Sequence, residues 1–294
     1  MPYKTPAEVA SAAVASGVAK ASLGPGKLFV SSFLAGAYIA FGGLVAIATT
    51  SGLKPATWGS LPTLVTGATF SLGLILVVIA GSDLLTGNMA VVTIAVLRRK
   101  VSPASWAANL GWVMVGNLVG ALLVAWLLAY KTGVIPDHHA GGIVYERIAA
   151  IAKGKAVTET HLQQFLRAIG CNWLVCLAVW LGLAAEDIAG KILGIFFPIL
   201  AFVAIGFDHV VANMFFLPLA MFDHVPGITG SLVAANLGWA LLGNLVGAAV
   251  FVAGAYHYLY LQGQPDQLAA NVPVEGEALD RPARAPRPGR SRRP

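Results

Sequence analysis

Long apolar runs separated by short polar segments make up most of this sequence. Four of the runs have the length of one membrane-spanning helix, roughly 20 residues. Two are longer, and the first of these would reach roughly 55 Å as a straight helix at 1.5 Å per residue, against a hydrocarbon core of about 30 Å. We therefore predict six spans, at about 28–50, 61–97, 104–130, 168–185, 191–222 and 232–260.

Both overlong runs contain a polar interruption. The second span holds Gly81-Ser82-Asp83-Leu84-Leu85-Thr86-Gly87-Asn88, and the fifth holds Gly206-Phe207-Asp208 followed by His209. Irregular backbone at membrane depth is tolerated only where it is buried in protein or lines a cavity. We therefore predict that each run is a half-helix, a non-helical segment and a second half-helix.

The composition agrees with a membrane protein and gives it an orientation. Of the 294 residues, 57% are hydrophobic and 11% are charged, whereas soluble domains have about a quarter charged residues. Thirteen lysines and arginines fall on the side of the termini and six on the other side, which predicts cytoplasmic termini in the cytoplasmic (inner) membrane and explains the net charge of +6 without nucleic acid. We expect a cytoplasmic amphipathic segment at 1–27, a transmembrane channel domain at 28–261, and a disordered basic cytoplasmic tail at 262–294.

An internal repeat divides the chain into two units of three spans. Residues 109–121 recur as 236–248 with ten of thirteen positions identical, and the two interrupted segments align at an offset of 125. Two three-span units in one chain must be inverted relative to each other, and paired discontinuous helices in inverted repeats are typical of transport proteins. The Gly-x-x-x-Gly pairs at 116/120 and 243/247 are explained by close helix packing alone.

Asp208 and His209 are ionisable residues inside an apolar run, and such residues in a span mark functional sites. Asp83 matches Asp208 in the repeat. For the two aspartates we weigh a proton relay against capping of the half-helix that follows each one, and we favour capping.

Taken together, these motifs resemble the formate/nitrite transporter family, pentameric anion channels with an aquaporin-like protomer. The resemblance covers about residues 5–260. It implies an all-α membrane protein of six spans in two inverted three-span repeats, with broken second and fifth helices, assembled as a homopentamer in the lipid bilayer. It is carried by 206–215, 171–180, 81–86 and both Gly-Asn-Leu-Val-Gly-Ala runs.

The resemblance also implies roles for individual residues. His209 would be the central pore histidine. A lysine in the vestibule matches Lys155 with a one-residue insertion, and Lys153 is the alternative. Polar partners along the path would be Thr86, Asn172 and Asn213, the outer constriction would be Phe70, Leu74 and Phe202, and the inner one would be Leu84, Leu85 and Val175.

Two alternatives stay open for the polar partners. Thr86 either orients His209 or bonds backbone freed by the break. Asn172 and Asn213 either line the path or bond a carbonyl of a broken helix.

The chemistry expected at His209 follows from the cost of moving an anion through an apolar region. Desolvating a bare carboxylate-sized anion costs several kcal/mol in relaxed protein, whereas protonating a weak acid of pKa about 4 at pH 7 costs about 4 kcal/mol. We therefore expect His209 to protonate the anion or to donate a strong hydrogen bond to it. Formate is the first candidate, followed by nitrite, hydrosulfide, acetate and lactate; channel and proton symporter both stay open.

Two other classes are less consistent with the sequence. A neutral-solute channel of the aquaporin class would carry Asn-Pro-Ala, which the chain lacks. A haem-binding subunit would need a second inward axial ligand, but His209 is the only histidine in mid-span. Because no phosphate-binding loop, paired catalytic carboxylates or metal-ligand spacing occurs, we expect no enzyme, no metal and no cofactor.

Overall fold

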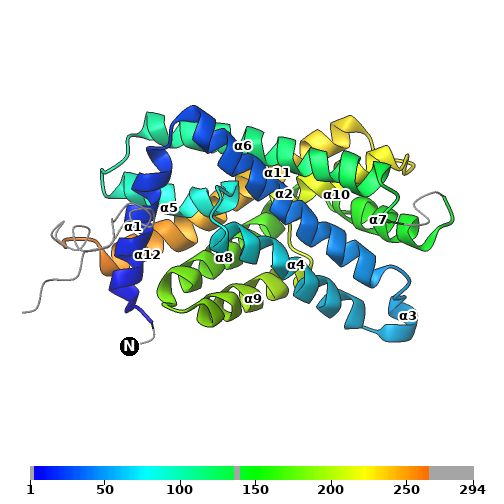
Figure 1. Ribbon diagram of the computed structural model, residues 1–294, viewed down its shortest axis with the longest axis horizontal. Helices are drawn as coiled ribbons and strands as arrows, with labels where there is room; N and C mark the ends of the chain where they lie inside the picture. The colour runs from blue at the N-terminus through cyan, green and yellow to red at the C-terminus, as the bar shows by residue number, and fades with distance from the viewer. Residues whose placement is uncertain (1–2, 136–139, 265–294) are drawn as a thin grey trace, which may run out of the picture.

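A computed structural model of the chain describes residues 3–135 and 140–264. Within these ranges the chain is helical and forms no strand, and its helices run mostly along the long axis of the molecule (Figure 1). The predicted number of six spans is confirmed by length and composition. They are α2 (Pro25–Thr50), α4 (Leu61–Ile79), α6 with the π-helical η1 (Pro103–Lys131), α8 (His161–Ala184), α9 (Ile188–Ile205) and α11 with η3 and α12 (Gly230–Tyr260).

Two short helices complete the interior. In the second run, α4 ends at Ile79 and α5 occupies Leu85–Leu97; in the fifth run, α9 ends at Ile205 and α10 occupies Val210–Phe222. Gly81 and Gly206 have φ of 79° and 85°, a left-handed conformation that glycine adopts without steric cost. Most side chains of α5 and α10 are buried, so the irregular backbone lies inside protein, as its polar groups require.

Three other helices lie outside the spans. The N-terminal segment forms α1 (Pro6–Ala21), which starts with a capping box between Thr5 and Glu8 and packs against α5. A four-residue helix, α3 (Pro55–Trp58), precedes α4. Within the segment expected to be polar, α7 (Ile143–Lys153) buries one apolar face. It is amphipathic and too short for a span, so its apolar residues do not form a long continuous run in the sequence.

The fourth span begins earlier than expected. We predicted a start at about 168, but α8 begins at His161 because Thr160 and Gln163 form a capping box at its N-terminus. Before it, a π-helical turn, η2 (Gly154–Thr158), joins α7 to α8. The predicted tail extends beyond Gln264, outside the described residues.

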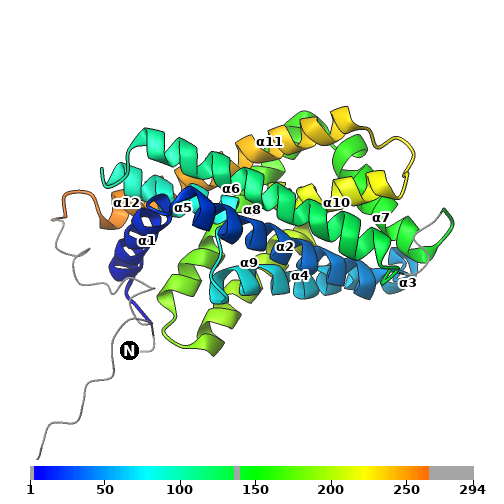
Figure 2. The ribbon, with the colours of Figure 1, turned by 45° about the horizontal axis from the view of Figure 1, so that its top comes forward.

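Glycines hold the long helices together in pairs. A Cβ on Gly120 of α6 would lie 2.0 Å from the carbonyl oxygen of Phe33 in α2, and a Cβ on Gly247 of α11 would lie 2.4 Å from that of Ile169 in α8. Only glycine permits these approaches, so the Gly-x-x-x-Gly pairs are packing residues. The two helix pairs are seen from a second direction in Figure 2.

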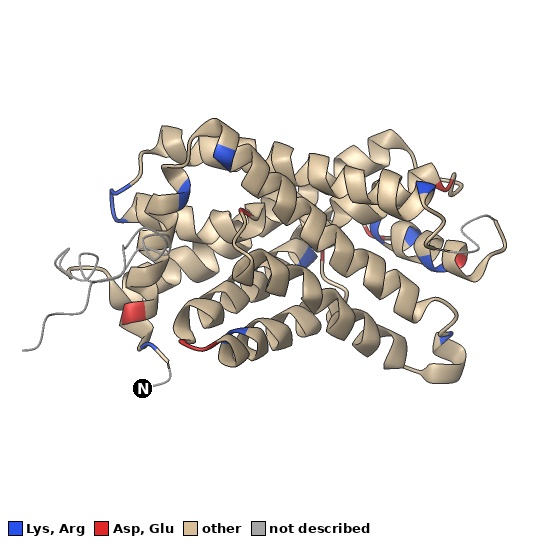
Figure 3. Ribbon diagram, viewed as in Figure 1, with Lys and Arg blue, Asp and Glu red and all other residues tan. Residues whose placement is uncertain are grey.

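Charged residues lie mostly near the two ends of the helices. Lysine, arginine, aspartate and glutamate gather toward the two ends of the long axis, with few between (Figure 3). The end with α1 and α12 carries the N-terminus, and the opposite end carries α3 and α7 (Figure 1). That the two three-span units are inverted relative to each other stays a prediction.

Candidate functional site

Two buried aspartates occupy the helix interruptions, and each is paired with a lysine. Asp83 lies 3.0 Å from Lys20 of α1, and Asp208 lies 2.7 Å from Lys155 of η2. We call the corresponding ends of the protein the Lys20 side and the Lys155 side. The Lys155 pair is the more enclosed, with 16% of the lysine side chain exposed, against 27% for Lys20.

On the Lys20 side, a closed network of hydrogen bonds surrounds the aspartate. Asp83 Oδ1 accepts from Lys20 Nζ at 3.0 Å and from Asn88 Nδ2 at 3.1 Å. Asn88 also donates to Asn109 Oδ1 at 3.0 Å, and the Asn109 amide donates to the carbonyl of Lys20 at 3.0 Å. The network therefore ties α1, α5 and α6 to the interruption.

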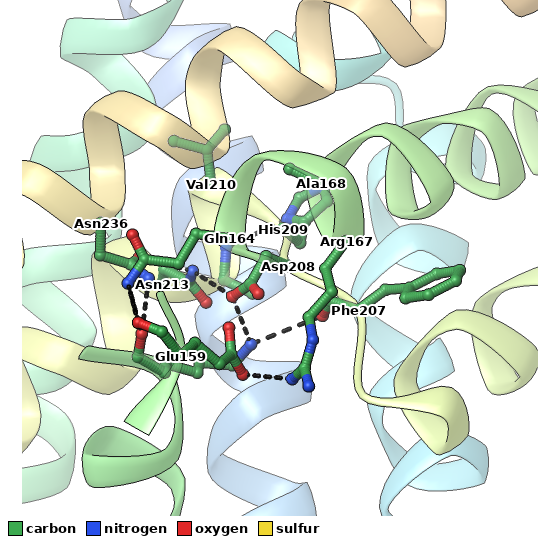
Figure 4. A network of polar contacts seen from close by, with 12 residues as sticks. Glu159, Gln164, Arg167, Ala168, Phe207, Asp208, His209, Val210, Asn213 and Asn236 are labelled. Atoms are coloured by element: carbon green, nitrogen blue, oxygen red, sulfur yellow. Dashed lines mark hydrogen bonds and ion pairs between the residues drawn. The ribbon is translucent and has the colours of Figure 1, made fainter. Parts of the chain in front are cut away.

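The Lys155 side repeats this network bond by bond (Figure 4). Asp208 Oδ1 accepts from Lys155 Nζ at 2.7 Å and from Asn213 Nδ2 at 3.0 Å. Asn213 donates to Asn236 Oδ1 at 2.8 Å, and the Asn236 amide donates to the carbonyl of Lys155 at 3.1 Å. The repeat in the sequence is thus also a repeat of polar contacts.

A side chain of α6 caps the N-terminus of the half-helix α5. The N–H of Leu85 donates to Asn117 Oδ1 at 2.9 Å. The Asn117 amide in turn donates to the carbonyls of Ser32 at 2.7 Å and Asp83 at 2.9 Å. One fully buried asparagine therefore joins α2, the interruption and α5.

Asn244 of α11 does the same for α10. It accepts from the N–H of Val210 at 2.9 Å and donates to the carbonyls of Ala168 at 2.8 Å and Asp208 at 2.9 Å. This corrects the prediction that Asp83 and Asp208 cap the half-helices. Their carboxylates accept bonds from lysine and amide side chains instead, because Asn117 and Asn244 already take the N–H groups at the helix starts.

His209 is the N-cap of α10. Its Nδ1 accepts a hydrogen bond from the N–H of Ala212 at 3.0 Å, and its Nε2 lies 2.8 Å from Thr86 Oγ1. A ring nitrogen that accepts from a backbone N–H carries no proton, so in the neutral imidazole the proton is on Nε2. The geometry therefore assigns His209 as the donor and Thr86 as the acceptor.

Apolar side chains adjoin this histidine. The His209 ring lies 5.9 Å from the ring of Phe202, and Phe202 packs edge-on against Phe70 at 6.0 Å, both centroid to centroid. All three residues are at most 3% exposed. The imidazole thus lies at the end of its own interruption, bonded to Thr86 at the start of α5, with an aromatic pair beside it.

The Lys20 side opens into a cavity of about 450 Å³ lined by Lys20, Asp83, Leu74 and Leu84. We expected Leu74 in the outer constriction with Phe70, and this placement is corrected. Leu74 lies one helical turn beyond Phe70 along α4, about 6 Å nearer the interruption, and therefore faces the same cavity as Leu84. Leu85 and Val175, the other two predicted inner residues, are buried.

The predicted polar partners have different surroundings. Asn172 donates to the carbonyls of Thr86 at 3.2 Å and Asn244 at 2.7 Å, which is the helix-carbonyl alternative. Asn213 belongs to the network around Asp208. Thr86 bonds His209 through its hydroxyl, which is the orienting alternative.

The two candidate lysines have different contacts. Lys155 pairs with Asp208, whereas Lys153 is exposed at the end of α7. The π-helical turn η2 contains Lys155, and a π turn takes one more residue than an α turn. The one-residue insertion that the resemblance implies for Lys155 stays a prediction, and this turn is where it would fit.

Several residues of the two networks were not predicted. Asn109 and Asn236 lie in the repeated Asn-Leu-Gly-Trp motif, so the repeat itself was a signal for them. Lys20 carried no such signal, because its partner Asp83 is 63 residues away in the sequence. Glu159 and Arg167, which pair with each other beside Lys155, were also missed.

Comparison with known proteins identifies the family. The formate/nitrite transporter family model matches residues 7–258. The probable formate transporter of Methanothermobacter thermautotrophicus is 48% identical over 88% of this chain and 98% of its own length. The nitrite transporter NirC of Escherichia coli is 37% identical over 80% and 84%. A solved pentameric formate channel with formate bound is 30% identical, with a TM-score of 0.70 over 81% of this chain and 98% of that one. The chain belongs to the formate/nitrite transporter family.

Proposed function

We propose that this multi-pass membrane protein carries small monovalent weak-acid anions, with formate first, past a neutral His209 that donates its Nε2–H to the anion. The observation that supports this most is the pair of contacts on the imidazole. Nδ1 is occupied by the N–H of Ala212, and Nε2–H faces a threonine hydroxyl that an anion could replace.

The same contacts distinguish between the two roles considered for His209. To donate a proton outright, the ring would first have to be an imidazolium, with a proton on Nδ1 facing the N–H of Ala212. That change would replace a hydrogen bond at the start of α10 by two opposed donors. Hydrogen-bond donation by the neutral ring needs no such rearrangement, so we favour it over proton transfer.

The surroundings of the path suit such an anion. Lys20 and Lys155 lie on opposite sides of His209, each paired with an aspartate, and their ammonium groups offer hydrogen-bond donors to an arriving anion. We propose Phe70 and Phe202 as the narrowing on the Lys155 side, and Leu74, Leu84, Leu85 and Val175 as the narrowing on the Lys20 side. Between them, a donated hydrogen bond offsets part of the desolvation cost of the anion.

The assembly and its orientation are also proposals. A homopentamer is supported by the similarity to the pentameric formate channel, and cytoplasmic termini in the inner membrane are supported by the thirteen-to-six distribution of basic residues. Nitrite is the second candidate substrate, because NirC is 37% identical to this chain.

Flux measurements in proteoliposomes test the proposal. Purified protein should conduct formate and nitrite far faster than protein-free liposomes, and should not accelerate glycerol or water. Glycerol or water flux without anion flux would overturn the proposal in favour of a neutral-solute channel.

A further inference from the structure

Glu159 is a nearly buried acid beside the Asp208–Lys155 pair. Its side chain is 8% exposed. Oε1 accepts from Arg167 of α8, while no described residue donates to the buried Oε2. The carboxyl group is within hydrogen-bonding reach of the Asp208 carboxyl group, and both belong to the cluster in Figure 4.

Asp208 has a matching unsatisfied oxygen. Its Oδ1 takes both Lys155 and Asn213, and among the described residues nothing donates to the buried Oδ2. Buried polar atoms in native proteins nearly always have a partner. Two facing carboxyl groups, each with one oxygen that lacks a donor, are both satisfied by a single proton placed between them.

On the Lys20 side, the second oxygen of the buried aspartate has a hydrogen-bond donor, so no proton is needed there. There, the second oxygen of Asp83 accepts from the hydroxyl of Ser31 at 2.6 Å. Because Ser32 and Ala168 occupy equivalent positions as acceptors for the two buried asparagines, the counterpart of Ser31 is Arg167. Arg167 extends to Glu159 and not to the aspartate, so the neutral donor is missing on the Lys155 side.

We propose that Glu159 and Asp208 bind one proton between them, with Glu159 Oε2–H donating to Asp208 Oδ2, and that this proton sets the charge of the vestibule on the Lys155 side. The charged residues facing Glu159 are Lys155 from η2, Arg167 from α8 and Asp208 from the interruption. With the proton bound, the cluster carries a net charge of +1; without it, the net charge is zero. Anion entrance is therefore favoured in the protonated state.

The electrostatics of Glu159 agree with this assignment. Burial, followed by the neighbouring Asp208, raises the pKa of Glu159 to about 8, against the opposing effect of Lys155 and Arg167. A raised carboxyl pKa means that the proton is held at neutral pH and lost as the pH rises through that value. The vestibule thus loses its net positive charge in alkaline solution.

The first test rests on the proposed anion transport and uses Glu159→Gln. The glutamine amide donates to Asp208 while its oxygen still accepts from Arg167, so it mimics the protonated acid at every pH. Formate flux is measured in proteoliposomes with equal pH on both sides. The ratio of variant to wild-type flux, which cancels the protonation of formate itself, should be near one at about pH 6 and rise roughly threefold or more by about pH 9.

Glu146→Gln is the matched control, because Glu146 is an exposed acid on α7, which leads into η2. Its ratio to wild type should stay constant with pH. A constant ratio for Glu159→Gln as well would overturn the proposal that the proton sets the vestibule charge. An absence of formate flux in the wild type would instead contradict the proposed function.

Infrared spectroscopy tests the proton without any transport. The wild type should lose a carboxylic-acid carbonyl band between about pH 6 and 9, and Glu159→Gln should lack that band at both values. If the variant keeps the band, or the wild type shows none at about pH 6, the shared proton is disproved.

Discussion

The two halves of this protein use the same scaffold for different chemistry. Each half has an aspartate, a lysine and two asparagines in the same bonding pattern around a helix interruption. The halves differ at the residue after the aspartate, which is Leu84 in one and His209 in the other. The repeated residues build the interruption in each half, whereas His209, the residue proposed to bind the anion, occurs in one half alone.

The buried asparagines should give the largest effect and test whether the scaffold is equivalent in both halves. Asn117→Leu and Asn244→Leu each leave two buried backbone groups without a partner, namely the N–H at the start of the half-helix and the carbonyl of the aspartate, at about 1–3 kcal/mol for each group. Both variants should therefore lose several kcal/mol of stability, or fail to yield folded protein. Thermal unfolding in detergent measures the loss. If only one of the two substitutions is tolerated, Asn117 and Asn244 do not have the same structural role.

Replacing the two lysines should give the next largest effect, and the loss of stability should differ between the two halves. Lys155→Met leaves Asp208 as a fully buried charge, and breaking a buried pair costs about 3 kcal/mol or more. Lys20→Met should cost about 1 kcal/mol or less, because Lys20 is more exposed and water can solvate the remaining carboxylate. Unfolding midpoints compare the two variants. Equal losses would contradict the assignment of Lys155 as the more enclosed partner.

Thr86 tests the functional difference between the halves. Thr86→Val introduces the residue found at the equivalent position of the other half, Val211, and removes the acceptor of the Nε2–H of His209. Loss of one such bond, at about 1 kcal/mol, should change formate flux about fivefold while leaving assembly intact. Thr86→Ser, which keeps the hydroxyl, is the control and should behave like the wild type.

Ser31 gives the smallest expected effect. Ser31→Ala removes the hydroxyl donor of Asp83 and should destabilise the protein by about 1 kcal/mol, read from the shift in unfolding midpoint. Ser22→Ala removes a comparable but exposed hydroxyl bond and should have a smaller effect. Equal shifts would argue that the second oxygen of a buried aspartate needs no donor, which would also weaken the argument for the proton at Glu159.

The number of spans and the places of the helix interruptions could be predicted from the sequence. Span length against bilayer thickness predicts six spans, and the two overlong runs with Gly81 and Gly206 locate the helix interruptions, since both signals are local in the chain. His209 could be singled out because an imidazole in an apolar run is rare. The family resemblance supplied the position of Lys155.

Contacts between distant segments could not be predicted in the same way. Sequence pattern gives no pairing of Lys20 with Asp83 or of Glu159 with Arg167. The position of a residue along the path could not be predicted from the sequence either. Phe70 and Leu74 share a face of α4, but Leu74 lies one turn further along and lines the cavity on the Lys20 side. The capping role expected of the aspartates failed because asparagines from α6 and α11 occupy the helix starts.

Nitrogen-15 NMR of the imidazole is the most direct test of how the anion is bound. Spectra of labelled protein, with His209→Asn used to assign the ring, report which nitrogen carries the proton. We predict a proton on Nε2 alone at neutral pH, and a shift of the Nε2 resonance when formate is added while Nδ1 stays unprotonated. A proton found on Nδ1, or a ring that does not respond to formate, would contradict the account.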